Sequence, residues 1–173
     1  MALTLLQDLD LNVTSFSFKD HLSSQFSDRL GSSDSRLRLT YNHPSQAIKC
    51  DVATDHASLV AKVLPHTAVH DGIRYALPSL LLADKIRTYC GRRAGNDEKR
   101  DNDLIDIIFL VGLMIEANTA MPDDLKTLIL TDDILNKFWN TLPDDEKPTY
   151  KEFLGDIGVA IGVCFLYLTL MFS

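Results

Sequence analysis

The period of the hydrophobic pattern changes along the chain, and this change limits the fold more than any other feature. In the first third of the chain, apolar and polar residues alternate, as in "QDLDLNV", "RLRLTY" and "AIKCDV". A period of two is typical of half-buried strands. From Pro78 onward, apolar residues recur every three or four positions, which is typical of amphipathic helices. The sequence therefore predicts an α+β protein in which a small mixed sheet is followed by an α-helical bundle.

This pattern predicts three regions, which are a sheet region at 1–64, a helical region at 65–156 and an apolar tail at 157–173. In the sheet region, the turn "NHPSQ" separates two alternating segments and predicts a β-hairpin. A stripe made of Phe18, Leu22, Phe26 and Leu30 predicts a helix. Gly31 is expected to end that helix.

Several helices are predicted in the second region. The first runs from Pro78 to Gly91, because proline suits a first turn and glycine a helix end. After a charged loop, "NDLIDIIFLVGLMIEAN" predicts a long helix, whose expected buried face carries Leu104, Ile107, Ile108, Val111 and Ile115. Shorter helices are expected after Pro122, Thr131 and Pro143. Phe138 and Trp139 are expected to anchor the core.

The tail from Ile157 to Ser173 carries no charge. Its length is at the lower limit of about 17 residues for a membrane-spanning helix. Three interpretations stay open: a buried last helix, membrane association through 157–173, and an unpacked apolar end.

The net charge and the cysteine content limit the possible partners and the expected cellular location. A net charge of −7 argues against a dedicated nucleic-acid binder, which needs a basic surface. Cys50, Cys90 and Cys164 are scattered and predict no disulfide framework or zinc site, so a reducing cytoplasmic location is expected, with membrane association as the alternative. His66 and His70 form an H-x-x-x-H pair, but Pro65 and Gly72 flank it, so a metal-binding helix is not expected there.

Three aspartates form the most informative group. Asp8 and Asp10 alternate with apolar residues and therefore belong to the same face of one strand. Asp51 lies on the polar side of a later strand, and if the two strands are neighbours, three carboxylates converge. Carboxylate oxygens suit Mg²⁺, and the cation would relieve the repulsion between them. The alternative is that all three are solvent-facing residues of an exposed sheet.

Four segments resemble the nucleotidyltransferase superfamily, which has a polymerase-beta-like fold. Thr4 with "QDLDLNV" is similar to the strand that carries the family's acidic pair, and "KCDV" at Lys49 to Val52 is similar to the strand of its third acid. "LLLADKIRTYCGRR" and "KRDNDLIDIIFLV" are similar to a helix, a basic loop and an Arg-Asp motif that follow. The resemblance covers residues 2–115 and is strongest to AbiEii-type toxins and fungal nucleotidyltransferase-like proteins.

The resemblance implies a metal-dependent transfer of a nucleotide from a nucleoside triphosphate to a hydroxyl acceptor. It implies that Asp8, Asp10 and Asp51 bind Mg²⁺ or Mn²⁺ and that Asp51 also deprotonates the acceptor. Lys85 would bind the triphosphate and assist catalysis. Arg100 would orient the nucleotide, or alternatively form local ion pairs at a helix start.

One element of the family pattern has no counterpart in the sequence. The family places a phosphate-binding glycine pair one strand and one helix before the acids, and no such pair precedes Asp8. We therefore expect weak metal binding and little nucleotide transfer. The alternative function is that of a non-catalytic binding protein or a decayed member of the family.

Overall fold

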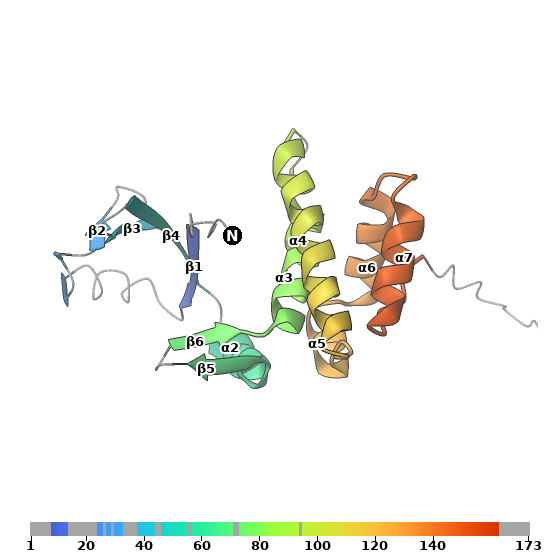
Figure 1. The fold of residues 1–173 in the computed structure, drawn as a ribbon, viewed down its shortest axis with the longest axis horizontal. Coiled ribbons are helices and arrows are strands. Elements are labelled where there is room, and N and C mark those ends of the chain that lie inside the picture. The colour runs from blue at the N-terminus through green and yellow to red at the C-terminus, as the bar shows by residue number, and fades with distance from the viewer. Residues whose placement is uncertain are drawn as a thin grey trace, which may run out of the picture. The chain divides into compact units, whose positions relative to one another are not determined.

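The computed structural model describes residues 8–13, 24–25, 27–28, 30–32, 38–43, 46–54, 57–70, 73–93 and 95–162 (Figure 1). The chain divides into two compact units, Met1–Leu64 and Pro65–Ser173. Strands dominate the first unit and helices the second. The expected α+β class is therefore confirmed.

The first unit contains a four-stranded mixed sheet with the strand order β1-β4-β3-β2. Its strands are β1 (Asp8–Val13), β2 (Leu30–Ser32), β3 (Arg38–His43) and β4 (Gln46–Thr54). β1 is parallel to β4, whereas the β4–β3 and β3–β2 pairs are antiparallel. Helix α2 (Ala57–Val63) and a short 3₁₀ helix, η1 (Leu64–His66), follow the sheet.

The expected hairpin is confirmed by the antiparallel pairing of β3 with β4, in which His43 is the partner of Gln46. The expected end of a helix at Gly31 is wrong, because Gly31 lies inside β2 and is the register partner of Thr40. Pairing with the next strand, β3, has overridden the local stop signal. Most of the expected helix from Phe18 lies outside the described residues.

A second hairpin, at the start of the helical unit, was not predicted. Strands β5 (Thr67–His70) and β6 (Ile73–Ala76) pair antiparallel, with His70 as the partner of Ile73. Two residues, Asp71 and Gly72, connect these partners in the sequence. Asp-Gly between alternating segments is a strong hairpin signal, so the sequence did contain the information.

The core of the second unit forms where α3 (Pro78–Gly91) packs against α4 (Asp97–Glu116). The predicted bounds of α3 are confirmed, and Leu82, Ile86 and Tyr89 are buried on its inner side. The buried apolar face of α4 consists of Leu104, Ile107, Leu110, Val111 and Met114.

Part of the expected inner face of α4 is wrong. Ile108 and Ile115 are 41% and 42% exposed, and Leu110 and Met114 are buried instead. The helix also begins at Asp97, inside the segment expected to be a charged loop. Because α4 is apolar nearly all round between Leu104 and Ile115, hydrophobic spacing alone did not define which face points inward.

Three short helices complete the unit: α5 (Asp123–Leu128), α6 (Asp132–Thr141) and α7 (Lys147–Asp156). Phe138 of α6 is fully buried, and its ring makes edge-to-face contacts with Tyr89 at 5.4 Å and Tyr150 at 5.8 Å between centroids. Such pairs add to the energy gained by burial. Phe138 is the expected anchor, whereas Trp139 is only half-buried.

In the described start of the apolar tail, alternate residues are buried and none is helical, so a continuous helix from Ile157 is wrong. The amide of Gly158 donates to Gly155 O, and the amide of Val159 donates to Leu154 O. With Gly158 at φ +77°, this is a Schellman motif, which ends α7. Ile157, Val159 and Ile161 then pack into the core.

Among the described residues, no helix has the length and apolar composition needed to cross a membrane. Residues 163–173, which make up most of the proposed tail, lie outside the described part of the chain.

The Schellman motif yields a stability prediction. Gly158→Ala should lower the free energy of unfolding by about 1–2 kcal/mol, because a side chain is strained at positive φ. Gly112→Ala is the matched control: it lies within α4, where an added Cβ meets nothing within 4 Å. It should raise the free energy of unfolding by up to about 1 kcal/mol. Urea denaturation followed by the fluorescence of Trp139, the only tryptophan, measures both, and a stabilised Gly158→Ala would contradict the assignment.

Candidate functional site

The acidic positions of the first unit come together through the pairing of β1 with β4. In this parallel pair, Asp10 is the register partner of Asp51, and Asp8 is the partner of Lys49. Neighbouring strands lie about 4.8 Å apart, and alternate residues of one strand about 6.5 Å apart. The expected neighbourhood of the two strands is therefore present, while the metal-ligand role of the three aspartates stays a prediction.

Two basic positions belong to the same rows of the sheet, and the sequence reasoning did not single them out as site residues. Asp51 has Arg38 of β3 as its second register partner, so Asp10, Asp51 and Arg38 form one row across three strands. The next such row contains Asp8 and Lys49. The signal was present in "RLRLTY", where Arg38 alternates with leucines. Two cationic positions among three acidic ones reduce the repulsion without any metal ion.

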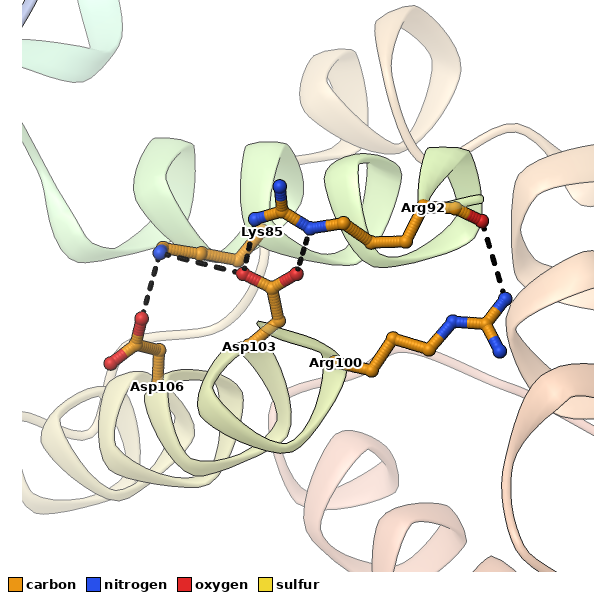
Figure 2. Close-up of polar contacts among 5 residues, drawn as sticks. All are labelled: Lys85, Arg92, Arg100, Asp103 and Asp106. Carbon is orange, nitrogen blue, oxygen red and sulfur yellow. Dashed lines mark hydrogen bonds and ion pairs between the residues drawn. The ribbon is translucent and has the colours of Figure 1, made fainter. Parts of the chain in front are cut away.

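Lys85 lies in a cluster of charged side chains between α3 and α4 (Figure 2). Its Nζ is 2.7 Å from Oδ2 of Asp106 and 3.7 Å from Oδ1 of Asp103. The side chain of Lys85 is 34% exposed. The ammonium is thus paired with two carboxylates and still reached by solvent.

Asp103 is the central residue of this cluster. Its side chain is only 3% exposed, and both of its oxygens accept hydrogen bonds from Arg92, from Nε at 2.7 Å and from Nη2 at 3.0 Å. This bidentate bond to Asp103 is the main cause of the raised pKa of Arg92. A buried carboxylate is tolerated only with such compensation, because removing it from water costs several kcal/mol.

Arg100, the second residue expected to bind nucleotide, lies at the end of the same cluster (Figure 2). Its Nη2 donates to the backbone oxygen of Arg92 at 3.3 Å, and its guanidinium lies 5.9 Å from the centre of the Tyr89 ring. Among the described side chains, Nε of Arg100 is buried without a hydrogen-bond partner. Arg100 therefore satisfies a carbonyl at the end of α3. This contact is a hydrogen bond to the backbone, whereas the alternative that the sequence left open was a local ion pair at a helix start.

His66 pairs with an aspartate of α5. Its Nε2 is 2.7 Å from Oδ2 of Asp124, which ties η1 to α5. The hydrogen bond with His66 is the main cause of the lowered pKa of Asp124. Among the side chains that the structure describes, which do not include those of Asp8, Asp10 and Asp51, no three His, Cys, Asp or Glu residues are arranged to hold a metal ion.

Comparison with known proteins adds no identification. No protein-family model matches the sequence, and neither a curated protein nor a solved structure is significantly similar to it.

The charged cluster yields a second stability prediction. Asp103→Asn should lower the free energy of unfolding by about 1–3 kcal/mol, because the buried amide keeps only one of the two acceptor oxygens that bind the Arg92 guanidinium. Asp106→Asn is the control. Asp106 is half-exposed, so its loss should cost no more than about 1 kcal/mol. Urea denaturation read by Trp139 fluorescence measures both, and equal effects would refute the central role of Asp103.

Proposed function

We propose that this protein is a nucleotidyltransferase-like protein that binds a divalent cation at Asp8, Asp10 and Asp51 and transfers a nucleotide from a nucleoside triphosphate to a hydroxyl acceptor. The observation that carries this proposal is the register of Asp10 with Asp51 in a parallel strand pair. Two acids on adjacent strands and a third two residues away are a hard-oxygen donor set of the type that Mg²⁺ and Mn²⁺ prefer.

The donor set fits the cation in its chemistry. When bound, a divalent ion would supply positive charge to the triphosphate. In this proposal Asp51 accepts the proton of the attacking hydroxyl, whose oxygen forms a bond to the α-phosphorus while the bond to the β-phosphate breaks and pyrophosphate leaves. Arg38 and Lys49, whose positions adjoin the acids in the sheet, are additional candidates for phosphate contacts.

Lys85 and Arg100 stay candidates for contacts with the nucleotide, although both side chains already have partners in the protein. Triphosphate oxygens would have to compete with Asp106 and Asp103 for the ammonium of Lys85. The exposure of Lys85 permits that competition, whereas Arg100 already donates to a backbone oxygen. Lys85 is therefore the stronger candidate of the two.

The ion pairs of Lys85 with Asp103 and Asp106 favour a second candidate function, that of a non-catalytic binding protein. If Lys85 serves only to neutralise Asp103 and Asp106, it is a structural residue. The basic positions at Arg38 and Lys49 would then offset the acids of the sheet, and no transfer chemistry would be needed.

Metal binding is the first test. Isothermal titration of the full chain with Mn²⁺ should show weak binding that Asp10→Asn and Asp51→Asn each reduce about tenfold or more, because affinity follows the number of charged ligands. Glu152→Gln, which removes an exposed acid from α7, should leave the affinity unchanged. Equal binding by all four proteins would contradict the site.

Incubation with labelled nucleoside triphosphates and Mn²⁺ separates the two functions. Labelling of an acceptor that depends on Asp10 supports the transferase. Metal binding that depends on Asp10, without labelling, supports the non-catalytic protein.

A further inference from the structure

A groove between α4 and α7 is apolar at its centre. It has a volume of about 370 Å³, and Leu104, Ile105, Ile108 and Tyr150 line it. Ile105 is 64% exposed, although it is a large aliphatic residue in the middle of a helix. The exposed apolar stripe continues along α4 through Phe109 and Leu113. From Ile105 to Leu113 the stripe extends about 12 Å, or two helical turns.

Among the described residues, acidic ones are the only charged residues in the lining of this groove, although Lys99, Arg100, Lys147 and Lys151 also lie on the two helices. Asp101 and Glu146 line the groove itself. Four more acids lie near these two: one is a helical turn before Asp101, one adjoins Glu146 in the turn before α7, and two lie further along α7. The six acids are exposed or half-exposed and have no ion-pair partner among the described residues; they are Glu98, Asp101, Asp145, Glu146, Glu152 and Asp156.

The charge of Glu146 affects the pKa of a tyrosine in the groove wall. Tyr150 forms part of the groove wall, and its hydroxyl donates to Leu104 O at 3.2 Å. Burial is the main cause of its raised pKa, and the charge of Glu146 is the second. A partner with positive charges at its edges would therefore be attracted to this surface, and one with negative charges would be repelled.

We propose that the α4–α7 groove is a docking site for an amphipathic helix of a partner protein, with aliphatic or aromatic anchors on one face and Lys or Arg on its flanks. The anchors would occupy the groove at Ile105 and Ile108, in the manner of a helix bound in a hydrophobic groove. The basic flanks would pair with the acids of α4 and α7. The proposal rests on the helical unit alone and is independent of the metal site.

Fluorescence anisotropy with two synthetic peptides tests the proposal on the full chain. Both peptides are fluorescein-labelled amphipathic helices of about four turns with leucine anchors at i, i+3 and i+7. One carries lysine on its flanks, and the other carries glutamate at the same positions. The lysine peptide should bind at least tenfold more tightly than the glutamate peptide, and its affinity should fall as salt is added.

Variants locate the binding surface. Ile105→Glu should weaken binding of the lysine peptide about tenfold or more, because it places a charge at the apolar centre. Leu81→Glu, a change at an exposed leucine of α3, should leave binding intact. The double variant Asp101→Lys with Glu146→Lys should reverse the preference toward the glutamate peptide.

Three results would overturn the proposal. Equal affinity for the two peptides would remove the charge argument, and no binding of either peptide would show that the groove is closed to an external helix. A wild-type dimer in light scattering that Ile105→Glu converts to a monomer would identify a second copy of this chain as the occupant instead.

Discussion

The carboxylate of Asp103 is the constraint on which the helical unit depends. It is buried between α3 and α4 and held by two hydrogen bonds from Arg92, with Lys85 as a more distant cation. Because an unpaired charge at this depth would be strongly unfavourable, α4 packs in the rotation that brings Asp103 to Arg92. This rotation buries Ile107, Leu110 and Met114 and leaves Ile105 and Phe109 on the outside. The ion pair, the buried core and the exposed apolar surface therefore all belong to the same rotation of α4.

The role of Asp103 explains which parts of the fold were predictable from sequence. The bounds of α3 follow from Pro78 and Gly91, which act locally, and these were predicted correctly. The inner face of α4 depends on a contact between residues 11 apart in sequence, and no periodicity encodes it. Ile108 and Ile115 were therefore assigned to the wrong side. The β5–β6 hairpin was predictable in principle from Asp71-Gly72. Strand β2 has only three residues, and it exists through its pairing with β3 rather than through an alternating pattern of its own.

The candidate site, too, was only partly predictable from the sequence. Alternation in the sequence placed Asp8, Asp10 and Asp51 on strands, and the register of β1 with β4 makes Asp10 and Asp51 neighbours. The cationic neighbours at Arg38 and Lys49 emerge only from the register. They matter because they offer an alternative means of offsetting the charge of the acids. For Lys85, the helix was expected, but its pairing with Asp106 was not. The proposed function therefore depends on whether a divalent cation binds at the acidic positions of the sheet or at Asp103 and Asp106 of the helical unit.

Paramagnetic broadening by Mn²⁺ in the amide NMR spectrum of the full chain tests this most directly, because it reports where the ion binds. The proposed site predicts selective broadening of amides near Asp8, Asp10 and Asp51, abolished by Asp10→Asn, with the amides around Asp103 unaffected. Broadening centred on Asp103 and Asp106, or none at β1 and β4 at millimolar Mn²⁺, would contradict the metal site and with it the proposed function.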